Sequence, residues 1–129
     1  MKNSFSFFHF DDQHTVSLPV VTDGDANISN GEIIYMNAGK PTPLATASAA
    51  GLKRYLVAEK YVVGNKNIVV WNLDETDYLV GLADDDCAVA GRYEINASKI
   101  TTGTTNDQVE IIKILKEGTD YNKVLFVLV

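Results

Sequence analysis

The sequence has few of the features that would place a protein in a chemical class directly. Its one cysteine, Cys87, cannot form a disulfide within the chain, so the fold does not depend on an oxidising compartment. No apolar run approaches the roughly 20 residues that a membrane-spanning helix needs. The short apolar run at the N-terminus is broken by Ser6 and His9, which is not typical of a signal peptide. We therefore expect a soluble protein, made in a cytoplasm, with no membrane partner.

Positive charge is scarce as well. The chain carries 11 Lys and Arg residues against 17 Asp and Glu residues, for a net charge of −6. An acidic surface repels the phosphate backbone of DNA and RNA. The charge balance therefore argues against nucleic acid as a partner.

Signatures of catalysis are missing too. The sequence has no nucleophile elbow, phosphate-binding loop, zinc-ligand spacing or dinucleotide fingerprint. His9 and His14 flank two aspartates, but an isolated pair of histidines in an aromatic segment is more often incidental than a metal site. The carboxylates of residues 84–86 raise the pKa of Cys87, which argues against a thiolate nucleophile. We expect no metal, no cofactor and no enzymatic activity.

Short runs of β-branched and aromatic residues, separated by Gly, Asn and Asp, make up most of the chain. Residues 52–82 are densest in them and predict two or three strands of the core sheet. Pro19 predicts an edge or bulged position for the strand at 15–22, and two prolines predict a loop at 37–43. Residues 107–115 fit a strand or a short helix, and their β-branched residues favour a strand. The sequence predicts an all-β barrel or sandwich of about eight to ten short strands.

The first 14 residues hold four of the five phenylalanines. They form either the first strand of the barrel or an N-terminal arm that packs on a neighbouring subunit, and residues 15–129 form a single β domain. An apolar terminal segment needs a cover, because exposed apolar patches promote association. The candidate partner-contact residues are Phe5, Phe7, Phe8, Phe10 and His9.

Trp71 is the only tryptophan and lies among Val and Ile residues in the middle of an expected strand. This position favours a place in the core. The alternative is an exposed platform for a sugar ring, which would suit a carbohydrate-binding module.

The order of segments between residues 22 and 82 resembles that of small auxiliary capsid proteins of tailed bacteriophages, also called decoration or cement proteins. The composition, rich in Asn, Lys and Asp, resembles that of crAss-like phages. The segments that carry the resemblance are Asn-Gly-Glu-Ile-Ile-Tyr-Met at 30–36, Lys-Pro-Thr-Pro at 40–43, Tyr-Leu-Val-Ala-Glu at 55–59 and Ile-Val-Val at 68–70.

The resemblance implies a barrel or tulip-like β domain on the outside of an icosahedral shell. Such proteins bridge subunits of the major capsid protein, often as homotrimers, and some use a terminal arm to reach adjacent capsomers. The expected location is then the capsid surface of a virion assembled in a bacterial cytoplasm. The alternatives are another β-structured virion component, such as a head-fibre or tail adaptor, and a carbohydrate-binding β-module.

Overall fold

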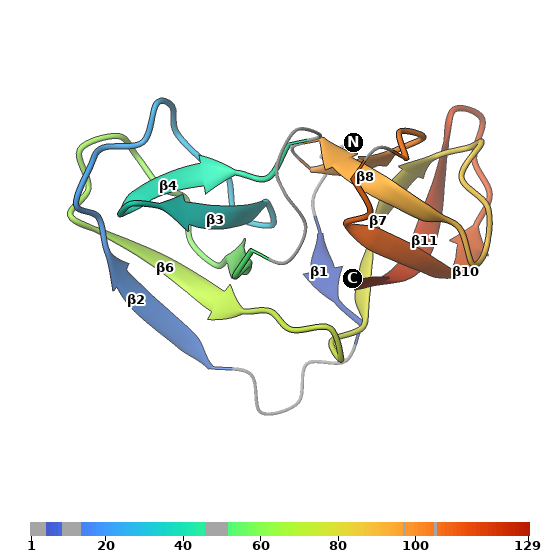
Figure 1. Cartoon of the computed structure of the whole chain (residues 1–129), viewed down its shortest axis with the longest axis horizontal. Coiled ribbons are helices and arrows are strands. Elements are labelled where there is room, and N and C mark those ends of the chain that lie inside the picture. Colours follow the sequence, from blue (N-terminus) through green and yellow to red (C-terminus); the bar gives the residue numbers. More distant parts are fainter. Residues whose placement is uncertain (1–4, 9–13, 46–51, 97, 105) are drawn as a thin grey trace.

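The computed structural model of the chain describes residues 5–8, 14–45, 52–96, 98–104 and 106–129. Within these residues it contains eleven strands in two sheets, which lie side by side in Figure 1. The prediction of an all-β fold is confirmed, and the strands number one more than the eight to ten that the sequence predicted. None of the described residues forms a helix long and apolar enough to cross a membrane.

Sheet A closes on itself. Its strand order is β1-β7-β11-β10-β8-β9, and β9 also pairs in parallel with β7, so that five strands form a small barrel with β1 added beside β7. At the closure the ammonium group of Lys99 lies 3.1 Å from a carboxylate oxygen of Asp84 and 4.5 Å from the centre of the Tyr121 ring. The hydrogen bond to Asp84 is the main reason why the pKa of Lys99 is raised. The strands of sheet A are β1 (Ser6–Phe7), β7 (Leu79–Asp84), β8 (Arg92–Asn96), β9 (Lys99–Thr101), β10 (Val109–Lys116) and β11 (Tyr121–Leu128).

Sheet B is open and antiparallel, with the order β2-β6-β5-β3-β4. The segment 52–82 therefore does not form one core sheet as expected, because β5 and β6 belong to sheet B whereas β7 belongs to sheet A. The prediction of an edge position for the strand that contains Pro19 is confirmed. The strands of sheet B are β2 (Thr15–Pro19), β3 (Ile33–Asn37), β4 (Lys40–Pro43), β5 (Tyr55–Val57) and β6 (Asn67–Asn72).

The prediction of a loop at 37–43 is wrong, because β3 and β4 form a tight hairpin there. Ala38 and Gly39 form its two-residue turn, with φ angles of 50° and 82°, as a type I′ turn requires. The next main-chain bond joins the Leu44 N–H to the Ile33 carbonyl. By alternation, the N–H position of both prolines in β4 then points away from β3. Proline costs this hairpin no hydrogen bond, since its missing N–H lies on the outer edge.

One hydrophobic cluster belongs to both sheets. Successive residues of a strand point to opposite faces, and on sheet B the face that carries Ile33 and Leu56 packs with Leu79 and Phe126 of sheet A. Each fully buried side chain of this kind stabilises the fold by about 1.5–3 kcal/mol. The opposite face of sheet B holds a second, smaller cluster of buried residues: Ile28, Ile34, Val57, Tyr61, Ile68 and Val70.

A buried arginine connects the two sheets. Arg54, just before β5, is 6% exposed, and its Nη1 donates to the main-chain oxygens of Gln108 and Val129 at 3.3 and 3.0 Å. The Gln108 side chain in turn accepts from the Ile95 N–H and donates to the Ala45 carbonyl. Burial lowers the pKa of Arg54, partly offset by the charge of Glu75. The network fixes sheet B against the end of the barrel where β10 begins and β11 ends.

We predict that Arg54→Met destabilises the protein by about 1–3 kcal/mol, since it leaves the buried Gln108 carbonyl and the partly buried Val129 oxygen without their donor. The free energy of unfolding from urea titration measures the effect. Lys53→Met is the matched control, because Lys53 is exposed and substitution there should change stability by no more than about 0.5 kcal/mol. Equal unfolding free energies for the two variants would contradict a structural role for Arg54.

Candidate functional site: the aromatic strand and the pocket beside it

The N-terminal aromatic segment forms the edge strand β1. Ser6 pairs with Val80 and Phe7 with Leu79, antiparallel to β7. The ladder continues beyond β1, where the Phe8 N–H donates to the Tyr78 carbonyl at 2.9 Å. Because side chains alternate, Phe5 and Phe7 point to the core side of sheet A, and Ser6 and Phe8 point to the other side.

Phe5 is part of the protein's own core. It is 2% exposed, and its ring meets the ring of Phe126 edge to face, with the centroids 5.2 Å apart. Its N–H donates to the Gly31 carbonyl at 2.7 Å, which ties the strand to the segment before β3. A Cβ atom added at Gly81 would overlap the Phe5 ring. The missing side chain of Gly81 therefore makes the space that the ring fills.

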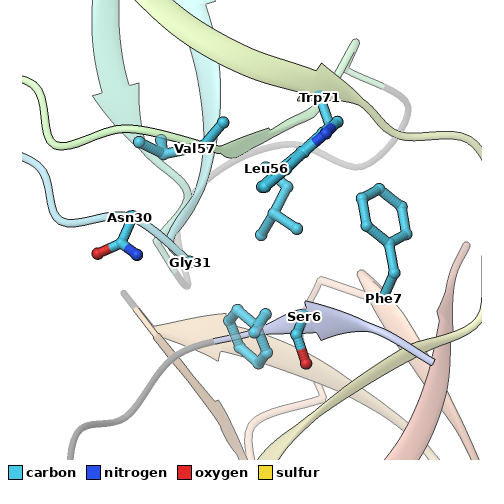
Figure 2. A pocket seen from close by; sticks show the side chains of 9 residues that line it. Ser6, Phe7, Asn30, Gly31, Leu56, Val57 and Trp71 are labelled. Carbon is cyan, nitrogen blue, oxygen red and sulfur yellow. The ribbon is translucent and has the colours of Figure 1, made fainter. Parts of the chain in front are cut away.

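Phe7 forms one wall of an open pocket between the two sheets. Its ring lies edge to face with Trp71, with the centroids 5.8 Å apart and the planes at 86°. The pocket measures about 260 Å³, and Figure 2 shows its apolar wall of Leu56 and the rings of Phe7 and Trp71. Ser6 and Asn30 also belong to its lining, and Figure 2 shows the Ser6 hydroxyl pointing away from Leu56 and Trp71.

Trp71 is thus half-buried, packed against the shared core on one side and lining the pocket on the other. The sequence favoured a purely internal place for it. The alternation in β6 explains the difference, because Trp71 faces sheet A near the end of the strand, where the two sheets separate.

Of the candidate contact residues that the structure describes, Phe8 is the exposed one. It is 46% exposed, and Tyr78, the residue opposite it in the ladder, is 49% exposed. Residues opposite each other in antiparallel strands carry their side chains on the same face, close together. Phe8 and Tyr78 therefore form an aromatic patch on the outer face of sheet A. The remaining candidates, His9 and Phe10, lie outside the described residues.

The acidic turn after β7 has a structural role in the described part of the chain. The Cys87 N–H donates to the Asp84 carbonyl at 3.0 Å, and the Asp85 N–H donates to the Asp120 carbonyl at 3.1 Å. Burial, followed by the charges of Asp84 and Asp86, raises the pKa of Cys87 to about 11. The thiol is therefore protonated at neutral pH and is a poor nucleophile. Among the described residues, no group of three or more His, Cys, Asp or Glu side chains could hold a metal ion.

Comparison of the chain with models of known protein families, with curated proteins and with solved structures finds no match in any of the three.

Two parts of the site were not singled out from the sequence. Gly81 stands between Val80 and Leu82 in an apolar strand, and a glycine at such a position often marks the close approach of another group. The close approach at Gly81 could therefore have been predicted from the sequence. The pairing of Phe8 with Tyr78 could not, because the register between segments 70 residues apart depends on the packing of Phe5 at Gly81.

We predict that Gly81→Ala destabilises the protein by about 1–3 kcal/mol, because the added methyl group overpacks the core against the Phe5 ring. Phe5→Leu alone should cost roughly 1 kcal/mol. The double variant should cost less than the sum, since the smaller side chain makes room for the methyl group. Urea unfolding followed by Trp71 fluorescence measures all three variants, and additive costs would show that the two residues do not compete for one space.

Proposed function

We propose that this protein is a non-enzymatic decoration protein of a tailed-phage capsid, which bridges major capsid protein subunits on the outer surface of the shell. The observation that carries the proposal is the aromatic patch of Phe8 and Tyr78. Patches of this kind mark contact surfaces on proteins, and aromatic side chains are enriched at the centres of interfaces.

The anchoring of β1 makes this patch suitable for binding a rigid lattice. Phe5 is buried and its N–H is hydrogen-bonded, so Phe8 is held in one place before a partner arrives. A side chain that is already ordered loses less conformational entropy on binding. A rigid β scaffold with exposed aromatic groups thus fits the task that the resemblance to auxiliary capsid proteins implies.

The proposed assembly is a homotrimer, because repetition strengthens weak contacts. Three patches on one particle bind a lattice with a much higher avidity than one patch, provided that the geometry lets all three engage. A head-fibre or tail adaptor could use the same patch. Binding to tails with no binding to shells would favour that alternative.

We predict that Phe8→Ser and Tyr78→Ser each weaken binding to shells made of the major capsid protein of the same virion. Loss of an interface aromatic residue costs about 2 kcal/mol or more, which corresponds to roughly thirtyfold in affinity per contact. Co-sedimentation with shells measures binding, and the heat stability of the decorated shells measures cementing.

Val89→Ser is the matched control for this experiment. Val89 is 53% exposed but lies before β8, away from β1 in the strand order. It should bind shells as the unchanged protein does. No binding of the unchanged protein to shells would rule out the proposed function, and equal loss in all three variants would mean that the patch is not the contact surface.

A carbohydrate-binding module is a second candidate, favoured by the pocket that Trp71 and Phe7 line. Aromatic rings offer an apolar face to a sugar ring, and a few polar groups fix its orientation. Ser6 and Asn30 are the polar residues of its lining.

If this second function holds, short oligosaccharides should shift the Trp71 fluorescence and bind at least tenfold more weakly to Trp71→Leu. Glycan-array screening identifies the sugar, and Phe8→Ser serves as the control because Phe8 does not line the pocket. An array without hits, or equal binding by Trp71→Leu, would exclude the pocket as a sugar site.

A further inference from the structure

Nearly every strand edge in the described part of the chain is closed, tied down or blocked. The pairing of β7 with β9 closes the barrel. Beside β1, the Phe5 N–H is bonded to the Gly31 carbonyl. The outer edge of β4 offers no N–H at either proline, and Pro41 is buried beneath the segment that contains Gly24. Natural proteins use these devices to prevent unwanted strand pairing.

Among the described residues, the outer edge of β2 is protected only at its end, where Pro19 lacks an N–H. In the described part of the chain β2 pairs with β6 alone, and Figure 1 shows it at the outer rim of sheet B. The Val20 N–H donates to the Lys66 carbonyl. Hydrogen-bonded and non-bonded positions alternate in an antiparallel ladder, so Leu18 and Val16 also bond to β6. The main-chain groups of Thr15, Ser17 and Pro19 therefore point outward.

The partner strand β6 supports this assignment. Ser17 lies opposite Val69, and the Val69 carbonyl accepts from the Ala58 N–H on the far side of β6. The carbonyl thus points away from β2, as expected for a non-bonded pair. The N–H and carbonyl of Ser17 lie at the centre of the outward edge.

We propose that this edge of β2 is a docking site for β2 of a second copy of the chain, with the two strands antiparallel about a two-fold axis at Ser17. In this register the two Ser17 residues exchange both of their main-chain hydrogen bonds. The Thr15 N–H donates to the Pro19 carbonyl of the second copy. Pro19 has no N–H to return, which limits the ladder to the centre of the strand.

The same register matches the side chains. Val16 of one copy lies opposite Leu18 of the other in a close, non-bonded pair. Both are only half-buried, at the margin of the second cluster of sheet B, and the pairing covers them. Ser17 meets Ser17 on the other face. No residue of β2 is charged, so self-pairing places no like charges opposite each other, although the net charge of −6 opposes association at low salt.

The contact is short, so it should form a concentration-dependent pair that salt strengthens. It is independent of the proposed function, since it uses sheet B and the capsid contact uses sheet A. It links either two single chains or two neighbouring trimers. At concentrations where every β2 edge is paired, the unchanged protein should therefore have a mass that is an even multiple of the chain mass.

Ser17→Pro tests the pairing, because it removes the N–H on the axis and none that bonds to β6. We expect the mass from sedimentation equilibrium to fall to half, with an unchanged far-UV circular dichroism spectrum. Ser17→Ala keeps the N–H and should keep the mass. An unchanged protein whose mass stays an odd multiple at high concentration and high salt, or no change in mass for Ser17→Pro under those conditions, would overturn the proposal.

Ser17→Cys gives a second, independent measurement. Directly opposite residues of a bonded pair have Cα atoms about 5.5 Å apart, which suits a disulfide. Mild oxidation should yield covalent dimers, whereas Ser29→Cys, an exposed control outside the strands, should yield few. Equal yields would count against the pairing. Protection of the Ser17 amide from hydrogen exchange only on shells would overturn self-pairing and indicate a strand of the capsid protein instead.

Discussion

The ring of Phe5 occupies the space that Gly81 leaves, and this contact sets the directions in which the next residues of the N-terminal segment point. Gly81 belongs to β7, which pairs with β1, β9 and β11 and is therefore the most connected strand of the barrel. With Phe5 fixed there, strand alternation leaves no freedom for the next residues. Phe7 must face Trp71, and Phe8 must face outward beside Tyr78. The exposed patch is a consequence of the buried ring.

The join between the two sheets combines apolar and polar contacts. The shared cluster supplies most of the stabilisation, because each large side chain buried there contributes more than a typical hydrogen bond. Apolar contacts alone tolerate sliding, whereas Arg54 can reach the Gln108 and Val129 oxygens in one arrangement of the sheets. The burial that lowers the pKa of Arg54 also shows that this charge has a desolvation cost. The polar network therefore fixes the position of sheet B more than it adds stability.

The sequence predicted those elements whose pattern is local. The segment at 107–115, for which the β-branched residues favoured a strand, forms β10 at Val109–Lys116. The hairpin at 37–43 could not be recognised by counting prolines. Prolines allow a hairpin when the position of each missing N–H points to the outer edge of the strand. The turn at Ala38 and Gly39 sets the pairing register of β3 and β4 and so puts both prolines at such positions.

In the candidate site, too, local features could be predicted and long-range ones could not. The cluster of Phe residues indicated a contact segment, and the alternation of Phe5 and Phe7 agrees with a half-buried strand. The split of 52–82 between two sheets is a long-range event with no local pattern, and it creates the pocket at Trp71. Partners of Phe8 and Trp71 therefore follow from tertiary pairing and not from spacing in the sequence.

The two sheets offer two different kinds of contact. Sheet A is closed except at the short edge strand β1, so a partner meets most of it through side chains, and its exposed aromatic pair suits a surface of fixed shape. Sheet B is open, and its β2 edge offers main-chain groups that any extended strand can satisfy. Prolines block β4 and leave β2 accessible, so pairing is restricted to one edge and cannot propagate through both sides of the sheet. The two-fold contact proposed for β2 closes on itself, so this pairing joins two copies without growing into fibres.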